Sequence, residues 1–318
     1  MRIAVYGTGG VGGFFGGKLA QHGHEVIFIA RGAHLEAIEK NGLKVESILG
    51  DFTIQPATTC ENPHQVGGSV DVVIVGVKTW QVEAAAEALR PLVGAQTLVL
   101  PLQNGVEAPA QLSAVLDVPG QPPHVLGGLC RLATRVAAPG VIQHSGIPPY
   151  IAFNRLDGQP DARVEALRAA LAATGVTAEV PADIQAALWV KFAFIAPFGG
   201  VGAVTRSPAG VLRSIPQTRR LLEQAIAEVA AVGTAHGVSL PPDLLQRTLA
   251  QMDSIPAGTI ASMQRDIMDG KPSELEAQTG AVVRLGAERG IPTPANGFIY
   301  AALLPMEKKA RGLLEYTH

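Results

Sequence analysis

Glycines near the start of the chain have the spacing of a phosphate-binding turn. The run Gly7-Thr8-Gly9-Gly10-Val11-Gly12 directly follows a short apolar segment at residues 2–6. In a dinucleotide-binding turn, the first glycine makes a tight strand exit, the second lets the backbone approach a pyrophosphate, and the third lets helix and strand pack closely. Free N–H groups at the start of the next helix favour phosphate. The motif therefore predicts that residues 7–12 bind a dinucleotide.

The surrounding residues support this interpretation and indicate which dinucleotide. Chance matches are expected from 36 glycines in 318 residues, but here a helical segment to about residue 22 and a second strand at 25–30 follow in order. An NAD site usually carries Asp or Glu at the end of that second strand. Arg31 stands there instead and suits a 2′-phosphate, which favours NADP(H). The alternative is that Arg31 is an ordinary exposed arginine.

One lysine stands inside a long apolar segment. Residues 186–198 are otherwise apolar almost throughout, which predicts a buried helix. Ile184, Leu188, Lys191 and Ile195 follow helical spacing, so Lys191 lies on an apolar stripe. Burying an ammonium group is costly, so a lysine retained there is a candidate functional-site residue. The alternative is a lysine with a buried stem whose charged end reaches solvent.

Two polar residues further along are ambiguous. Glu274 is a candidate acid, but Ser273 and Glu276 fit a capping box, and a glutamate in a first helical turn favours the helix dipole. Ser262 suits a helix start or a surface position equally well. Spacing alone assigns neither residue a chemical role.

The order of apolar segments predicts a doubly wound parallel α/β sheet of the Rossmann type in the first half. Residues 71–77 and 96–100 read as buried strands around a helix at 81–92. Segments 43–49 and 52–54 read as strands, 118–150 as outer strands and loops, 162–173 as a helix and 177–180 as a last strand. Lys78 and Asn104 follow the two buried strands, at the carboxyl edge where ligands of such sheets bind. We expect both beside residues 7–12.

The pattern becomes helical after Pro181. Helices are predicted at about 183–196, 217–236, 243–253, 259–269, 274–289 and 295–309, with glycines and prolines between them. The sequence therefore predicts an NADP-binding domain at 1–182 and an all-α substrate and catalytic domain at 183–318.

Composition narrows the function classes. A net charge of −2 and 16% charged residues give no basic footprint for nucleic acid or an anionic membrane. Lys191, Pro197 and several glycines interrupt the most apolar run, and no basic-then-apolar leader opens the chain, so we expect a cytoplasmic protein without a membrane span. Cys60 and Cys130 are far apart and outside any metal-ligand spacing, so we expect reduced thiols and no metal site.

Taken together, these motifs resemble the ketopantoate reductase (2-dehydropantoate 2-reductase) family over nearly the whole chain. The resemblance rests on residues 7–12 with Ala30-Arg31-Gly32, Val77-Lys78-Thr79-Trp80-Gln81, Gln103-Asn104-Gly105, Trp189-Val190-Lys191-Phe192, Ser262-Met263 with Asp266-Ile267, and Ser273-Glu274. It implies NADPH on the Rossmann domain, a helical second domain and a substrate cleft between them. It also implies that Lys191 is the catalytic lysine, that Lys78 and Asn104 border the nicotinamide, and that Ser262 and Glu274 face substrate or cofactor.

The chain departs from the family pattern on the substrate side. The family usually carries asparagines four and eight residues after the catalytic lysine, where this chain has Ile195 and Gly199. Because polar pockets discriminate through their hydrogen bonds, this loss affects substrate identity more than reaction type. Three hypotheses remain: NADPH-dependent reduction of 2-dehydropantoate, reduction of a less polar ketone or imine, and a non-catalytic NADPH-sensing module. A homodimer is the default expectation for the assembly.

Overall fold

The chain divides into two compact units. The computed structural model describes residues 1–315, and its internal contacts group residues 1–103 and 107–184 into one unit. The second unit contains residues from Gln185 onward together with Asn104–Val106. The short segment 104–106 thus belongs to the helical unit, although it lies within the sequence of the first.

The first unit is built on a parallel sheet, as predicted. Its strands are β1 (Arg2–Tyr6), β2 (Glu25–Ile29), β5 (Thr58–Cys60), β6 (Val72–Val75) and β7 (Leu98–Pro101), in the spatial order β5-β2-β1-β6-β7. All four pairings are parallel. The central strands are buried on both faces, which explains their unbroken apolar sequences.

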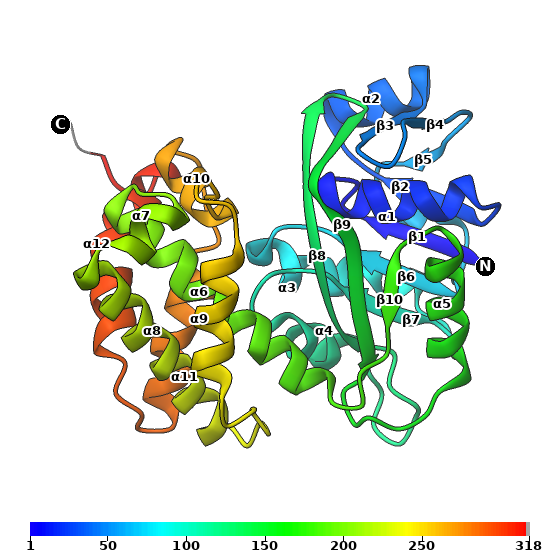
Figure 1. Ribbon diagram of the computed structural model, residues 1–318. Coiled ribbons are helices and arrows are strands. Elements are labelled where there is room, and N and C mark those ends of the chain that lie inside the picture. The colour runs from blue at the N-terminus through cyan, green and yellow to red at the C-terminus, as the bar shows by residue number, and fades with distance from the viewer. Residues whose placement is uncertain (316–318) are drawn as a thin grey trace. The chain divides into compact units, whose positions relative to one another are not determined.

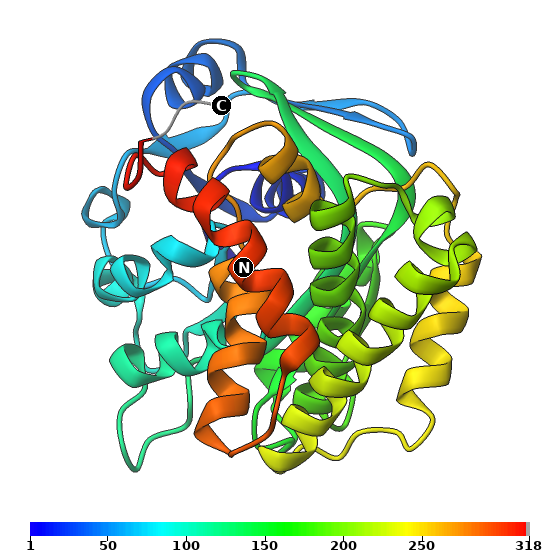
Figure 2. The same cartoon turned by 90° about the vertical axis from the view of Figure 1, so that its left-hand side faces the viewer.

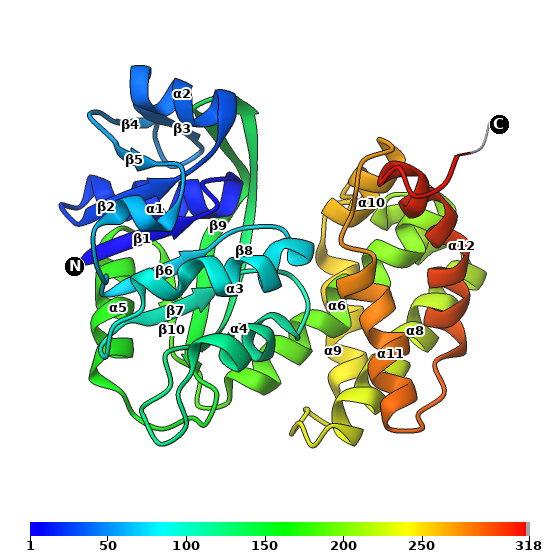
Figure 3. The same cartoon turned by 180° about the vertical axis from the view of Figure 1, so that it is seen from behind.

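Successive side chains of each strand feed two separate cores. Ala4 and Tyr6 of β1 pack with α3 (Val82–Leu89) and α4 (Ala108–Leu116), which lie side by side over one face (Figure 3). Ile3 and Val5 pack toward α1 (Gly10–Gln21) and α5 (Ala162–Ala173) on the other face. The helix α4 was not predicted from the sequence.

A second sheet covers α1 from the far side. It contains β3 (Leu43–Ser47), β4 (Phe52–Ile54), β9 (Val141–Arg155) and β10 (Thr177–Glu179), and β8 (Leu126–Ala138) pairs with β9. Figure 1 shows β8 and β9 as one long ribbon that passes α1. Residues 118–150, predicted as outer strands and loops, therefore supply most of a long hairpin, and α1 lies between two sheets. The remaining elements of this unit are short: α2 (Gly32–Asn41), η1 (Pro63–Val66), η2 (Thr79–Gln81) and η3 (Arg90–Leu92).

The second unit is helical, as predicted. Its elements are α6 (Ile184–Thr205), α7 (Ala209–Ser214), α8 (Pro216–Ala235), α9 (Leu244–Ser254), α10 (Ser262–Met268), the π-helix η4 (Glu276–Gly280), α11 (Ala281–Glu288) and α12 (Pro294–Ala310). Figure 2 shows α12 in red crossing beside η4 and α11 in orange. Helix α7 was not predicted.

The long helix α6 continues past the predicted end at residue 196. Pro197 lies inside it and removes one backbone hydrogen bond, yet the helix runs to Thr205. Ala193, Ala196 and Val201 are fully buried around the proline, so packing holds the helix together there. Lys191, Pro197 and the glycines were expected to rule out a membrane span here, but α6 is long and apolar enough to cross a membrane by length and hydropathy alone. However, 67% of its most apolar window is buried inside the protein. Its apolar composition is that of a core helix.

Candidate functional site

The glycine-rich turn has the geometry of a dinucleotide cradle. Gly7 has a φ of +93°, a conformation that favours glycine, and a Cβ there would lie 2.7 Å from the Val77 nitrogen. A Cβ on Gly12 would collide with the Gly7 carbonyl oxygen, whereas one on Gly9 would meet nothing within 4 Å. The space beside Gly9 is therefore open, whereas Gly7 and Gly12 are closely packed, which is the arrangement expected of a dinucleotide-binding turn.

The turn is held to the neighbouring strand through Thr8. The backbone nitrogens of Gly7 and Thr8 both donate to the Ile29 carbonyl at 3.3 Å, and the Thr8 hydroxyl donates to the same oxygen at 3.0 Å. Thr8 is 3% exposed, so its side chain serves the fold of the turn, while Val11 is half-buried in the first turn of α1. The predicted cofactor role of these residues thus concerns their backbone.

Gly10 has a packing role that the sequence did not indicate. A Cβ on Gly10 would lie 2.9 Å from the Thr134 hydroxyl and 3.1 Å from the Arg135 nitrogen, both on the β8–β9 ribbon. A Cβ on Gly13, one turn later, would lie 2.9 Å from Ile142 of β9. Because Gly10 and Gly13 have no side chains, the β8–β9 ribbon can pack directly against the first turns of α1.

Arg31 is exposed at the N-cap of α2, directly after β2. Its backbone is extended, with φ −140° and ψ 156°, and α2 begins at the next residue. An exposed guanidinium at this position is available to a phosphate, and the described residues place no acidic side chain in the first turn of α2.

The carboxyl ends of β6 and β7 are joined by a buried glutamine. Gln103 is 6% exposed, and its side-chain nitrogen donates to the carbonyls of Val75 at 2.9 Å and Val77 at 3.0 Å. Lys78 follows on this edge, exposed, with its Nζ 5.7 Å from the centre of the Trp80 ring. The sequence predicted Lys78 at this edge but gave no sign that Gln103 fixes the strand ends beneath it.

Asn104 and Glu274 are in contact. The Asn104 side-chain nitrogen donates to Glu274 Oε2 at 3.2 Å, and Glu274 is 7% exposed. Gly105 has a φ of +102°, and a Cβ there would lie 2.7 Å from the carbonyl oxygen of Ala277. The segment 104–106 therefore packs tightly on the residues that follow Glu274, and two predicted site residues 170 positions apart are brought together.

The helix that follows Glu274 begins with a π segment, a feature frequently found at functional sites. Gly280 N donates to the Leu275 carbonyl at 2.9 Å, five residues back. Glu276 accepts a hydrogen bond from the Tyr300 hydroxyl at 2.6 Å, and burial together with this bond raises the pKa of Tyr300 to about 12.

The capping box predicted for Ser273 and Glu276 is wrong. Ser273 Oγ still accepts from the nearby Leu275 N at 3.2 Å, but it donates to Glu307 Oε2 at 2.5 Å, so its carboxylate partner is Glu307 and not Glu276. Glu307, from α12, is 2% exposed and also accepts from the Ser273 backbone nitrogen. Glu274 is therefore anchored by its neighbours, and its carboxylate is left to contact Asn104.

Lys191, Ile195 and Gly199 lie on one face of α6, at intervals of four residues. Lys191 and Ile195 are half-buried, while Leu188 and Phe192 beside them are buried. Gly199 is covered: a Cβ there would lie 2.9 Å from Met263 Cε and 3.5 Å from Gln278 Oε1. Ser262 is exposed at the start of α10, and it is its neighbour Met263 that reaches α6. Met263 was named only as part of the Ser262-Met263 motif, and its contact with α6 was not predicted.

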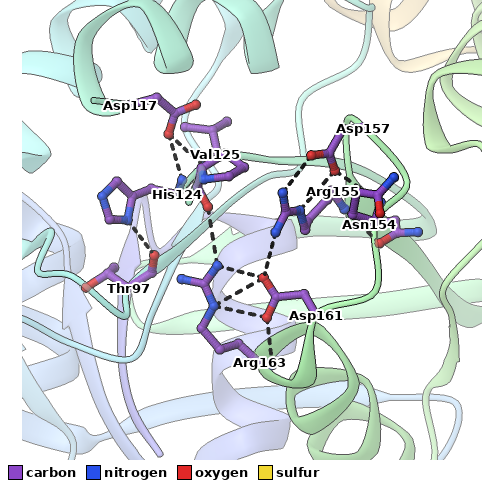
Figure 4. A network of polar contacts seen from close by, with 11 residues as sticks. Thr97, Asp117, His124, Val125, Asn154, Arg155, Asp157, Asp161 and Arg163 are labelled. Atoms are coloured by element: carbon purple, nitrogen blue, oxygen red, sulfur yellow. Dashed lines mark hydrogen bonds and ion pairs between the residues drawn. The ribbon is translucent and has the colours of Figure 1, made fainter. Parts of the chain in front are cut away.

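The first unit also contains a polar network around Asp117, His124, Asp161 and Arg163 (Figure 4). Asp161 pairs with Arg163 at 2.6 Å and Arg155 at 3.7 Å, and Asp117 accepts from the backbone nitrogen of His124 at 2.7 Å. Thr97, which accepts from His124, precedes β7, so this network sits at the amino-terminal edge of the sheet. It is a structural network, since ligands of such sheets bind at the opposite edge. Among residues 1–315 no group of three His, Cys, Asp or Glu could hold a metal ion.

Comparison with known proteins connects both units with one family. Residues 3–158 match the family model described as "Ketopantoate reductase PanE/ApbA", and residues 183–307 match the model of its C-terminal part. A 2-dehydropantoate 2-reductase from Mesorhizobium japonicum is 30% identical over 92% of this chain and 94% of its own length. A PanE/ApbA family ketopantoate reductase from Ralstonia eutropha has a TM-score of 0.88 at 33% identity, covering 98% of this chain and 100% of its own. D-mandelate dehydrogenase, solved with NADH and anilino(oxo)acetate, shares the fold with a TM-score of 0.88 at 21% identity, covering 98% and 99%.

Proposed function

The chain belongs to the ketopantoate reductase family, and from this premise we propose that it reduces a 2-oxo acid with NADPH, with Lys191 as the proton donor. Family membership makes the protein an oxidoreductase acting on a CH–OH group, which argues against a non-catalytic sensing module. The first candidate substrate is 2-dehydropantoate, the substrate in the name of the Mesorhizobium relative.

The glycine-rich turn is the observation that supports the cofactor. Open space at Gly9 and close packing at Gly7 and Gly12 fit a pyrophosphate against the start of α1. Arg31 would hold the 2′-phosphate, and Lys78 and Asn104 would border the nicotinamide. The bound cofactor would supply the hydride, and the protein would position the ketone and donate the proton.

The helical unit would supply the proton and orient the substrate. Lys191 would hydrogen-bond the ketone oxygen and donate a proton to it as the alcohol forms, a contribution typically of about 10²–10⁴ in rate. Glu274 would act through Asn104, whose amide it holds at 3.2 Å, so that the amide is oriented toward its ligand. Ser262, exposed at the start of α10, would contact the substrate.

The first test is NADPH oxidation by the purified protein with ketopantoate, repeated with NADH. NADPH-selective turnover supports the proposal. Tight NADPH binding without turnover would contradict ketopantoate as the substrate but leave the reductase chemistry standing.

The role of Lys191 is tested by Lys191→Ala. We expect kcat to fall by about 10²–10⁴ while the Kd for NADPH, measured by calorimetry, stays near the wild-type value, because the general acid is lost and the cofactor turn is untouched. Lys308→Ala, at an exposed position on α12, is the matched control and should leave both quantities unchanged. Loss of NADPH binding in Lys191→Ala would assign Lys191 to the cofactor instead.

The covering of Gly199 by Met263 favours a second candidate, a 2-oxo acid less polar than ketopantoate. The family's usual asparagine cannot be placed at 199 without displacing Met263, whose Cε lies 2.9 Å from a Cβ there. Ile195, one turn earlier, is apolar as well. A pocket wall of isoleucine and methionine would leave a substrate hydroxyl without a hydrogen-bond partner.

A pair of substrates decides between the two candidates. 3,3-Dimethyl-2-oxobutanoate is ketopantoate without its hydroxyl group, so the ratio of the two kcat/KM values reports hydroxyl recognition. A site built for the hydroxyl prefers ketopantoate by orders of magnitude, whereas an apolar wall gives a ratio near or below unity. In the second case, Ile195→Asn with Gly199→Asn and Met263→Ala should raise the ratio by about tenfold. The same two asparagines without Met263→Ala are the control and should destabilise the protein.

A further inference from the structure

His34 connects three segments of the first unit. It lies in the first turn of α2, and its Nε2 is 2.7 Å from the carbonyl oxygen of Thr8 in the glycine-rich turn. Its Nδ1 accepts a hydrogen bond of 3.0 Å from the backbone nitrogen of Gly140, in the turn between β8 and β9. The Gly140 carbonyl in turn accepts from Lys44 N of β3 at 2.9 Å. One imidazole thus ties the glycine-rich turn to α2 and to an anchored hairpin turn.

The partners of His34 determine its tautomer. A backbone N–H only donates, so Nδ1 must be the acceptor toward Gly140 and the ring proton must sit on Nε2. That proton is donated to the Thr8 carbonyl, which also only accepts. The two hydrogen bonds therefore require a neutral ring with the proton on Nε2.

As a result, Thr8 is hydrogen-bonded through both its backbone nitrogen and its backbone carbonyl. On one side its nitrogen and hydroxyl donate to Ile29 of β2, and on the other its carbonyl accepts from His34. Arg31 is the N-cap of the helix that carries His34, and its carbonyl accepts from Leu35 N at 3.4 Å. His34 therefore links the turn that cradles the pyrophosphate to the turn that presents Arg31.

We propose that His34 is a positioning residue that fixes the spacing between the glycine-rich turn and Arg31, and that this spacing sets the preference for a 2′-phosphate. The inference rests on the proposed use of NADPH. In that ligand the pyrophosphate and the 2′-phosphate are covalently linked at a limited range of distances, so two protein elements held at the matching distance bind both without ordering cost. A dinucleotide without the 2′-phosphate would contact the glycine-rich turn but gain nothing from the placement of Arg31.

Two substitutions separate the links that His34 makes. His34→Gln places an amide nitrogen near the position of Nε2 and keeps the donor to Thr8. His34→Asn places an oxygen near the position of Nδ1, which keeps the acceptor for Gly140 and removes the donor to Thr8. We expect His34→Gln to bind NADPH almost as the wild type does, and His34→Asn to raise the Kd for NADPH by about tenfold with a smaller rise for NADH, measured by calorimetry without substrate.

The Arg31→Ala background completes the experiment. If His34 acts by placing Arg31, then in the Arg31→Ala protein His34→Asn should raise the Kd for NADPH by no more than it raises the Kd for NADH. The proposal is overturned if His34→Asn and His34→Gln both bind NADPH like the wild type. It is also overturned if His34→Asn raises the Kd values for NADPH and NADH by the same factor, which would make His34 a purely structural link. A wild-type protein without preference for NADPH would contradict the proposed cofactor itself, and this inference with it, which the wild-type titration reveals before any variant is made.

Discussion

Single residues in this protein often have a role that only their spatial neighbours reveal. Ser273 looked like half of a local capping box, yet its hydroxyl bonds Glu307 on another helix. Met263 was named only as a neighbour of Ser262 in a sequence motif, yet it covers Gly199. Arg31 is the opposite case, because its place after β2 was evident from the motif and the structure finds it exposed at the N-cap of α2.

Arg31→Ala tests the cofactor preference at the residue scale. A charge-assisted hydrogen bond to a phosphate contributes about 1.5–3 kcal/mol, so we expect the Kd for NADPH to rise by about 10- to 100-fold while that for NADH changes little. Lys40→Ala, an exposed cation in the last turn of the same helix, is the control and should alter neither Kd. Equal weakening of both dinucleotides would show that Arg31 does not read the 2′-phosphate.

At the scale of the element, α1 shows how close packing restricts which residues a helix can carry. Every residue from Gly12 to Leu19 is buried, because one sheet lies on each side of the helix. Gly16 faces Val5 and Phe28 of the parallel sheet, and Gly13 faces Ile142 of the second sheet. The glycines within α1 therefore serve helix packing, whereas the space beside Gly9, the N-cap residue, is open.

Two alanine substitutions in the turn should separate packing from ligand binding. In Gly12→Ala the new methyl group meets the rigid Gly7 carbonyl, so we expect a loss of about 1–3 kcal/mol of unfolding free energy, measured by urea denaturation. In Gly9→Ala the φ of −81° suits alanine and the space is open, so stability should be retained while NADPH affinity falls by at least tenfold. A Gly9→Ala protein that binds NADPH normally would refute the placement of the pyrophosphate.

At the scale of the whole molecule, two units with separate cores share one chain. The first unit has a core on each face of its parallel sheet, and the helical unit has two clusters that meet along α6. Polar groups at the amino-terminal edge of the parallel sheet stabilise the first unit, and Asp161 is central among them. Hydrogen bonds from Arg163 hold the pKa of the Asp161 carboxyl below its ordinary value. Assembly as a homodimer and location in the cytoplasm stay predictions.

The lowered pKa of Asp161 predicts how stability depends on pH. Because the folded carboxyl releases its proton more readily than the unfolded one, its contribution is fully present above about pH 4 and is lost as pH falls through the folded pKa. Asp161→Asn should therefore lower the unfolding free energy by about 1–3 kcal/mol at pH 7 and by less toward pH 3. Asp157→Asn is the control, since this exposed carboxylate also pairs with Arg155 but should cost about 0–1 kcal/mol. If the loss of unfolding free energy in Asp161→Asn is as large at pH 3 as at pH 7, the lowered pKa of Asp161 does not contribute to stability.

The sequence by itself determined the parallel sheet, the glycine-rich turn, the helical second half and the family. These features depend on local spacing: glycines at fixed intervals, apolar runs that follow the period of a strand or a helix, and residues that directly follow strands. Arg31, Lys78, Asn104 and Lys191 could be named as candidates in this way, whereas Glu274 gained a role only through the family resemblance.

The tertiary structure alone decided which side chains meet. The contact of Asn104 with Glu274, the covering of Gly199 by Met263 and the link from His34 to Thr8 join segments far apart in the chain. The continuation of α6 past Pro197 and the β8–β9 ribbon over Gly10 also depend on burial against distant elements, which outweighs local preference. A pattern with a period of two or 3.6 residues contains no information about these distant pairings, and they are the contacts on which the proposed cofactor and substrate preferences rest.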